Sequence, residues 1–307
     1  MKAAARPAGG DPAESPPQGL PPAAHPRRPR HALPPGATDC HCHLYEDPQR
    51  HPLNGARSYT PAVATLRQYL AMCAAVGLER TVQVSASVYG FDNSVTLGAI
   101  AALGQQRARG VAGLPPDAPA AELERLHAAG IRGVRLSTSV KGYGGTDAIG
   151  AMAGRIRPFG WHLQVHVRGT QELAALEDQL LRTQVPLVFD HMGCVRGGEG
   201  VAHPGFQALL RILQRRDDCW AKISSWYRRS DSGGPDHADM RPLVQALVAA
   251  RPERLLFGTN WPHPRLFDAA RMPDDGALVD QFCDWVPDAA VRRRILVDNP
   301  STLYFSN

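Results

Sequence analysis

The sequence lacks any long hydrophobic segment. No uninterrupted apolar run in the 307-residue chain approaches the roughly 20 residues that a membrane-spanning helix needs. Hydrophobic residues make up 43% of the chain and charged residues 21%, which is ordinary for a globular protein. We therefore expect a soluble protein that has no membrane partner.

The chain also lacks a basic domain, although its formal net charge is +5. Residues 1–35 contain five basic residues against two acidic ones, so this short segment holds most of the excess charge. Its Arg27-Arg28-Pro29-Arg30 run is more typical of a solvated tail than of a nucleic-acid site. We therefore exclude nucleic acid as the main partner.

Cysteines are too few and too scattered for a disulfide framework. The Cys40-x-Cys42 spacing fits neither a zinc knuckle nor a redox pair, and a buried free thiol behaves as a small apolar residue. The N-terminus has no apolar segment typical of a secretory signal. These absences predict a reducing compartment and a cytoplasmic protein. The six cysteines are Cys40, Cys42, Cys73, Cys194, Cys219 and Cys283.

Residues 1–35 consist largely of proline, alanine and glycine. This composition supplies too little apolar surface to offset the entropy of ordering the chain. We predict a disordered leader over residues 1–35 and a single folded domain over residues 36–307. Removal of the residues before Pro34 is then expected to leave folding unchanged.

After the leader, short apolar β-type runs alternate with longer stretches of helical periodicity. Thr60-Pro61 and His203-Pro204 are typical helix starts. Four of the expected helices cover residues 62–75, 122–129, 171–181 and 206–215. Eight strands are predicted, at residues 37–42, 81–86, 110–114, 131–136, 161–167, 186–190, 219–223 and 254–257.

Alternating strands and helices predict parallel strands joined by right-handed crossovers. Eight such units in one domain indicate a closed (β/α)8 TIM barrel of the α/β class. An open doubly wound sheet would show a glycine-rich phosphate turn after its first strand. Here that strand ends instead in Asp39-Cys-His-Cys-His43, which favours the barrel.

Histidines occur at several predicted strand ends, where barrel enzymes place their chemistry. His41 and His43 alternate with Cys42, so both imidazoles point to the same side of the first strand. His166 ends the fifth strand, His191 the sixth, and His263 follows the eighth. Neutral imidazole suits both divalent metal ions and acid–base catalysis near pH 7.

An ordered set of motifs carries a family resemblance. It comprises His41-x-His43, Val188-Phe-Asp-His-Met-Gly193, Lys222-Ile-Ser-Ser-Trp-Tyr-Arg228 and Gly258-Thr-Asn-Trp-Pro-His263. The set resembles the amidohydrolase superfamily, in particular the branch of 2-pyrone-4,6-dicarboxylate hydrolase and related lactonases. The resemblance implies a hydrolase of aromatic compound catabolism that acts on a small anionic substrate.

The same resemblance implies roles for individual residues. His41, His43 and His191 match histidines around the scissile lactone carbonyl. Asn260 stands where the pattern has an acid that activates water, and a carboxamide can orient water but cannot accept its proton. The residues implied in substrate binding are Tyr59, Ser87, Arg135, Lys141, His166, Arg228 and His263.

The cofactor requirement has two interpretations at this point. His166 replaces a tyrosine of the dicarboxylate hydrolase pattern and resembles metal-binding members instead. His41, His43, His166 and His191 would then hold one zinc-like divalent ion. The nearest branch, however, resembles a metal-independent enzyme, for which no cofactor is obligatory.

Three functions are compatible with these residues. The first is hydrolysis of a lactone or a related ester-like bond in a carboxylated cyclic substrate. The second is a non-hydrolytic reaction on a similar acid, such as decarboxylation or isomerisation, in which Asn260 only orients. The third is a binding protein that has lost activity together with the acid. Product analysis separates the first two, and tight binding without turnover indicates the third.

Overall fold

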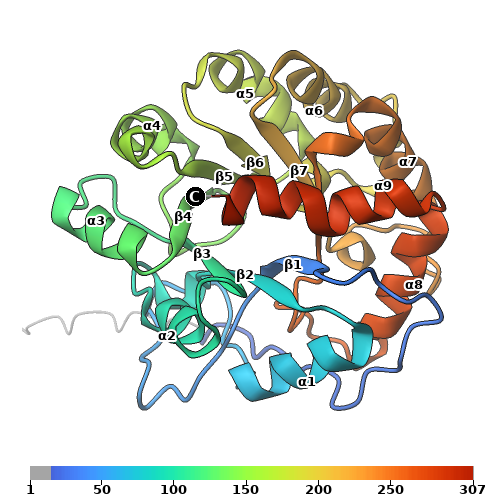
Figure 1. The fold of residues 1–307 in the computed structure, drawn as a ribbon, viewed down its shortest axis with the longest axis horizontal. Coiled ribbons are helices and arrows are strands. Elements are labelled where there is room, and N and C mark those ends of the chain that lie inside the picture. Colours follow the sequence, from blue (N-terminus) through green and yellow to red (C-terminus); the bar gives the residue numbers. More distant parts are fainter. Residues whose placement is uncertain (1–14, 307) are drawn as a thin grey trace, which may run out of the picture.

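The computed structural model describes residues 15–306; residues 1–14 and 307 lie outside the described part. Its centre is one sheet of eight parallel strands that follow one another in sequence order around a barrel (Figure 1). This confirms the predicted (β/α)8 barrel, and each observed strand overlaps the run that predicted it. The strands are β1 Thr38–Cys42, β2 Arg80–Val84, β3 Ala108–Ala112, β4 Ile131–Ser137, β5 His162–His166, β6 Leu187–Phe189, β7 Cys219–Ser224 and β8 Leu255–Gly258.

A helix follows each strand and packs on the outside of the barrel, and α9 is added after α8 (Figure 1). His203 caps α6 as predicted, whereas α1 begins later than Thr60 because Thr65 and Gln68 form a capping box. Within residues 15–306, no helix has the length and apolar character to cross a membrane. The helices are α1 Leu66–Val76, α2 Ser94–Leu103, α3 Ala120–Ala128, α4 Ile149–Ile156, α5 Thr170–Arg182, α6 Pro204–Arg215, α7 Arg241–Ala250, α8 Asp275–Trp285 and α9 Ala289–Arg293.

The barrel closes between β1 and the residues that follow β8. The backbone N–H of Asn260 donates to the carbonyl of His41 at 2.7 Å, and the N–H of His43 donates to the carbonyl of Trp261 at 2.8 Å. These hydrogen bonds place the residues after β8 directly beside the two histidines of β1. The closure therefore helps to build the mouth of the barrel.

The C-terminal segment covers the opposite, N-terminal end of the barrel. Tyr304 is 1% exposed and packs with Cys40, Val82 and Leu256 inside the barrel. Next to it, the ring of Phe305 lies 4.7 Å from the guanidinium carbon of Arg80, at the start of β2. With this end filled by side chains, the mouth at the C-terminal strand ends is the place for chemistry.

Residues 15–35 differ from the disordered leader that composition predicts. They contact the barrel along their length: Gly19 donates to the carbonyl of Thr60, and Arg27 and Arg30 both contact Asp280 of α8. The contacts with Asp280 join residues about 250 positions apart in the chain, which is why composition did not reveal them. The rest of the predicted leader, residues 1–14, lies outside the described residues.

Candidate active site

A small cavity lies at the C-terminal ends of the strands. Its volume is about 20 Å³, which is enough for roughly one water molecule. A ring-shaped organic substrate therefore requires the loops at this mouth to move apart. The lining residues come from the ends of β1, β2 and β4 to β8, and they are His43, Tyr59, Ser87, Arg135, Val140, His166, His191, Arg228, Asn260, Pro264 and Arg265.

Left-handed backbone conformations place several of the side chains at this mouth. His191 has a φ of 51°, Ser225 of 58° and Asn260 of 59°. For residues other than glycine, such conformations cost about 1–3 kcal/mol each and cluster at functional sites. At Gly258, an added Cβ would lie 2.7 Å from the Cβ of His41, so glycine allows β8 to approach β1. The backbone at these strand ends therefore follows the pattern of a functional site.

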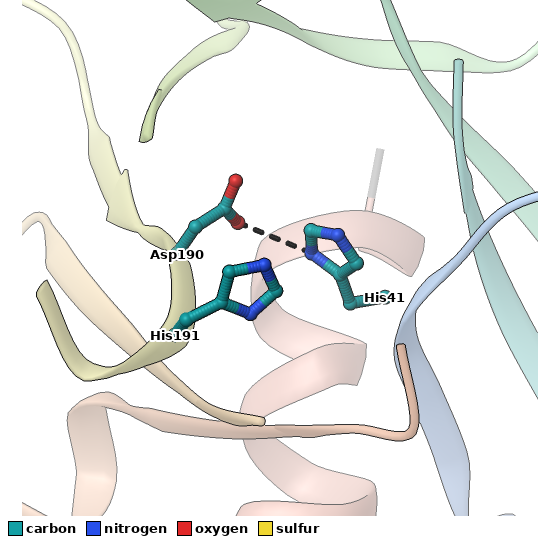
Figure 2. Close-up of side chains that lie close together, drawn as sticks. All are labelled: His41, Asp190 and His191. Carbon is teal, nitrogen blue, oxygen red and sulfur yellow. Dashed lines mark ion pairs between the residues drawn. The ribbon is translucent and has the colours of Figure 1, made fainter. Parts of the chain in front are cut away.

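Asp190 is the centre of a buried charged cluster beside the cavity, and Figure 2 shows it with His41 and His191. Its Oδ2 accepts hydrogen bonds from Nε of Arg135 at 2.8 Å and Nε2 of Gln164 at 3.1 Å. Its Oδ1 lies 3.1 Å from Nδ1 of His41 and 3.7 Å from Nζ of Lys222. Burial alone would raise the pKa of Asp190, but the positive charges around it lower this pKa well below the ordinary value. Asp190 is therefore an ionised carboxylate.

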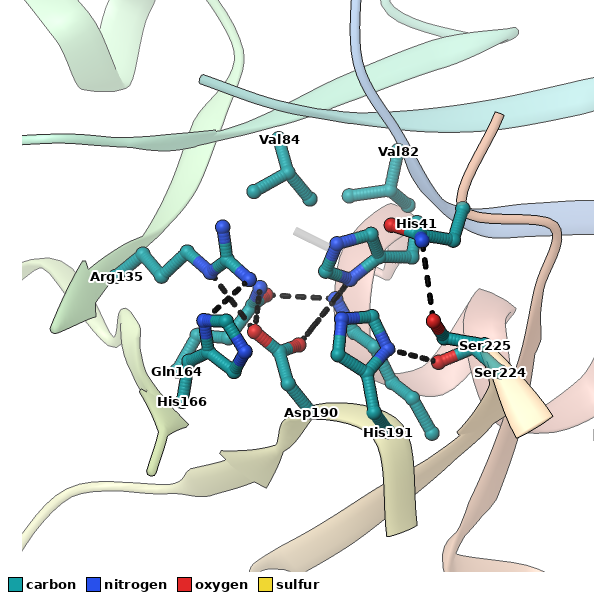
Figure 3. A network of polar contacts seen from close by, with 12 residues as sticks. His41, Val82, Val84, Arg135, Gln164, His166, Asp190, His191, Ser224 and Ser225 are labelled. Atoms are coloured by element: carbon teal, nitrogen blue, oxygen red, sulfur yellow. Dashed lines mark hydrogen bonds and ion pairs between the residues drawn. The ribbon is translucent and has the colours of Figure 1, made fainter. Parts of the chain in front are cut away.

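The hydrogen bonds around this cluster determine which ring nitrogens carry protons (Figure 3). The carbonyl of Val84 lies 2.9 Å from Nδ1 of His43, so that nitrogen is the donor and Nε2 of His43 is an acceptor. Nε2 of His41, 3.3 Å away, then carries a proton. Neutral His41 has a bare Nδ1, which accepts from the ammonium of Lys222 at 3.3 Å. Oδ1 of Asp190 lies 3.1 Å from the same Nδ1, and the ammonium of Lys222 faces both atoms.

The four histidines at the mouth are neutral at pH 7. Burial lowers the pKa of His41 to about 3, and the nearby carboxylate of Asp190 only partly offsets this effect. Burial likewise lowers the pKa values of His43, His166 and His191 well below the ordinary range, with the positive charge of Arg135 acting in the same direction. Unprotonated imidazole nitrogens are therefore present for proton transfer without a preceding deprotonation step.

Three potential metal ligands come together in this cluster. Donor atoms of His41, Asp190 and His191 all lie within 4.8 Å of one another (Figure 2). The set contains two of the four histidines in the predicted metal site. It contains Asp190 in place of His43 and His166. By distance alone, a single divalent ion has a plausible set of one carboxylate and two imidazole ligands.

The charges around these ligands do not fit a divalent ion. Asp190 already forms an ion pair with Arg135, and the ammonium of Lys222 lies against the same carboxylate. Burial lowers the pKa of Lys222 to about 8, which still leaves it mostly protonated at pH 7. Two cations thus face one anion, and a dication would add positive charge to a buried cluster that is already net positive.

Most of the predicted site residues meet at the cavity. His41 lies directly behind His43, with the ring centroids 5.0 Å apart. Two predicted substrate-binding residues do not line the cavity: the side chain of Lys141 is exposed, and His263 is buried behind Tyr227. The predicted residues that line it are His43, Tyr59, Ser87, Arg135, His166, His191, Arg228 and Asn260.

Arg135 lines the cavity, but neighbouring protein groups already bind most of its guanidinium. Besides Asp190, it contacts Nδ1 of His166 through Nη2 at 3.0 Å, and its Cζ lies 5.4 Å from the ring of Tyr143. The guanidinium of Arg135 therefore binds the buried carboxylate of Asp190 rather than presenting itself to a substrate carboxylate.

Arg228 and Arg265 have a different environment. Neither forms an ion pair with an acidic side chain among residues 15–306, although Arg265 donates to the carbonyl of Ser139 at 3.2 Å. Burial, and after it the positive charges of Arg265 and Arg229, lower the pKa of Arg228. The mouth therefore has two guanidinium groups that lack an anion.

Sequence reasoning missed five residues of this site. Gln164 and Lys222 are polar positions within apolar strands, and Gln164 lies two residues before the predicted His166, so period-two alternation signals an inward direction. Asp190 precedes His191 at the end of β6 and carries a similar signal. Tyr227 lies in the short 3-10 helix Trp226–Arg228 and Arg265 in a loop, and no local pattern indicates the direction of either side chain.

The comparison with known families agrees with this architecture. The amidohydrolase family model matches residues 38–305, which is nearly the whole described barrel. The chain belongs to the amidohydrolase family.

Curated relatives cover almost the full chain. It is 36% identical to 2-pyrone-4,6-dicarboxylate hydrolase of Comamonas testosteroni, over 92% of this chain and 94% of that protein. It is also 36% identical to 4-sulfomuconolactone hydrolase of Rhizobium radiobacter, over 93% and 97% of the two chains. D-galactarolactone isomerase of Agrobacterium fabrum is 30% identical, over 90% and 93%.

Proposed function

We propose that this protein hydrolyses a lactone or a related ester-like bond in a small, carboxylated cyclic substrate. Two relatives with near-complete coverage support the reaction type, because both are named as hydrolases of an anionic ring compound. The family match over residues 38–305 supports the use of the same barrel mouth.

The observation that carries the proposal is the pair Arg228 and Arg265. Both guanidinium groups face the cavity, and neither has an acidic partner among residues 15–306. A partly buried cation without a counterion is unfavourable, and a bound carboxylate removes that penalty through charge-assisted hydrogen bonds. Tyr59 and Ser87 line the same cavity and add hydroxyl groups for the substrate.

The reaction needs a proton acceptor and a group that orients water. We assign the acceptor to His191, whose Nδ1 is held by the hydroxyl of Ser224 at 2.7 Å and whose ring faces the cavity. The water oxygen bonds to the carbonyl carbon, the ring C–O bond breaks, and the proton taken by His191 passes to the leaving oxygen. Asn260 orients the water. The His43–His41–Lys222 chain places positive charge behind the developing oxyanion.

Isomerisation of a lactone is the second candidate. The relation to D-galactarolactone isomerase favours it, as does the absence of an acid at position 260, since an isomerase need not activate water. Turnover in ¹⁸O-labelled water separates the two reactions. Hydrolysis places one ¹⁸O atom in the product carboxylate and raises the product mass by one water, whereas isomerisation changes neither.

The first prediction concerns charge recognition. Arg228→Met and Arg265→Met are each expected to raise KM for 2-pyrone-4,6-dicarboxylate at least ~30-fold, because losing one partner of a desolvated charge pair costs about 2–5 kcal/mol. A neutral lactone should be affected far less. Arg125→Met is the control, since Arg125 is an exposed residue of α3 paired with Glu122. Equal losses on charged and neutral substrates would assign the two arginines a structural role.

We also propose a cytoplasmic location. All six cysteines are buried and free, which suits a reducing compartment.

A further inference from the structure

We infer that a buried chain of three residues, Asp275, His263 and Tyr227, positions the Asn260 amide at the cavity. The inference rests on the proposed function in one respect, namely that Asn260 orients the attacking water. It assigns a role to three side chains that do not line the cavity or touch the substrate, and it explains how a carboxamide acts where an acid is missing.

The chain runs outward from the cavity by direct contacts. Nδ2 of Asn260 donates to the hydroxyl of Tyr227 at 3.0 Å and to Oγ of Ser225 at 3.2 Å. The Tyr227 hydroxyl lies 2.9 Å from Nδ1 of His263, and Nε2 of His263 lies 3.2 Å from Oδ1 of Asp275. Asn260 and the three residues of the chain are between 1% and 5% exposed.

The direction of hydrogen-bond donation along these side chains follows from Asp275, the residue farthest from the cavity. A carboxylate only accepts, so Nε2 of His263 carries the proton and Nδ1 is the acceptor. Nε2 of His263 and Oδ1 of Asp275 have no other hydrogen-bond partner among residues 15–306, so each serves the other. Asp275 is the first residue of α8 and directly follows the N-cap residue Asp274.

Tyr227 transmits this polarity to Asn260. Burial raises the pKa of Tyr227, so the phenol keeps its proton and donates it to Nδ1 of His263. The lone pairs of its oxygen remain for the N–H of Asn260. The Asn260 amide thus has its NH₂ group on the Tyr227 side, and its carbonyl oxygen, which accepts no hydrogen bond from residues 15–306, can bind a water in the cavity.

This orientation matters because the two ends of an amide have nearly the same shape. A flipped Asn260 would present N–H donors to a water molecule that must itself donate, which is the wrong polarity for attack. Loss of a residue that orients a metal ligand from behind lowers activity by roughly 10–100-fold, and we expect an effect of this size for a residue that orients Asn260. We therefore expect the chain to affect kcat more than KM.

The test compares two buried tyrosines. With 2-pyrone-4,6-dicarboxylate as substrate, Tyr227→Phe should lower kcat ~10–100-fold with little change in KM. Tyr304→Phe is the matched control, because the hydroxyl of Tyr304 is buried at the opposite end of the barrel without a hydrogen-bond partner among residues 15–306. Similar kcat losses in both variants would overturn the inference.

A double variant separates positioning from a general structural effect. If Tyr227 acts through Asn260, Tyr227→Phe should reduce the activity of Asn260→Ala no further, whereas independent roles multiply. If the losses of activity in the two single variants multiply in the double variant, Tyr227 does not act through Asn260.

A second readout does not depend on turnover. The ¹⁵N chemical shifts of His263 should show the Nε2–H tautomer in the parent protein and in Tyr227→Phe, because Asp275 still accepts from Nε2, and a mixture of tautomers in Asp275→Ala, where Nε2 has lost its acceptor. An Nδ1–H tautomer in the parent protein, or an unchanged Nε2–H tautomer in Asp275→Ala, overturns the inference. This measurement needs no substrate. It therefore tests the hydrogen bonds of Asp275, His263 and Tyr227 even where the lactone assay shows that the proposed function is wrong.

Discussion

At the scale of single residues, burial keeps the four histidines at the mouth unprotonated over a wide range of pH. The pKa of His41 is lowered to about 3, and the pKa values of His43, His166 and His191 are also well below the ordinary range. A base works in its deprotonated form, which is lost only when the pH falls through the lowered pKa. We predict that kcat/KM stays flat from about pH 7 down to pH 5, in contrast to an unperturbed histidine, which titrates near pH 6.5.

The measurement is the pH profile of kcat/KM, with circular dichroism recorded at each pH to exclude unfolding. Arg135 and Lys222 face these rings as cations and Asp190 as an anion, and all three keep one charge state between pH 5 and 7. An acid limb centred near 6.5 would contradict the neutral cluster, because it would require an imidazole with an ordinary pKa.

The site residues also show how much of the site could be predicted from the sequence. The histidines were predictable because strand ends converge at one mouth whatever the side chains are. The pairing of Arg135 was not, since it depends on the barrel placing β4 near the end of β6, where Asp190 follows. His263 continues a recognisable motif, yet its positive φ and its contact with Asp275 turn it away from the cavity.

At the scale of elements, residues 15–35 act as a strap on α8. Asp280 has a side chain only 2% exposed, and it is contacted by Nη1 of Arg27 at 2.7 Å and by Nε of Arg30 at 3.2 Å. At Gly276, a Cβ would lie 2.0 Å from the carbonyl oxygen of Arg27, so the strap packs directly on the first turn of α8. Asp275 of the positioning chain lies in this same turn.

We predict that a chain beginning at Pro34 is less stable, contrary to the expectation from composition. Removing Arg27 and Arg30 leaves Asp280 buried without these partners, which costs about 1–3 kcal/mol and lowers Tm by several degrees. Thermal unfolding of the truncated and full-length proteins checks this. Asp280→Asn and Asp284→Asn provide the comparison: Asp284 contacts Arg30 but is 46% exposed, so its loss should change Tm little. Equal Tm for the truncated and full-length chains would mean that the strap contributes nothing.

At the scale of the whole molecule, the alternation of β and α segments predicted the barrel because the pattern repeats over the full domain. The last turn was not predictable. Tyr304 enters the barrel end in a segment of no clear periodicity, and the ring of the adjacent Phe305 packs on Arg80 and Arg109 from two other strands. The local sequence indicates which secondary structure a segment forms. Where that segment packs depends on the space that the strands leave at the end of the barrel.

The charge of the mouth is likewise a property of the whole barrel, since Asp190, Arg135, Lys222 and the histidines come from five different strands or their ends. Because Arg135 and Lys222 already compensate Asp190, we predict that the purified protein contains well under one equivalent of divalent metal and keeps its kcat after chelation. The decisive comparison is Lys222→Met, which removes one cation while the ligands His41, Asp190 and His191 remain. This variant should bind zinc more tightly than the parent by at least ~10-fold, in elemental analysis and in titration, because a nearby positive charge no longer opposes the ion. Stoichiometric metal in the parent protein, together with loss of activity on chelation, would show that the ion overcomes this repulsion and that the cluster is a metal site.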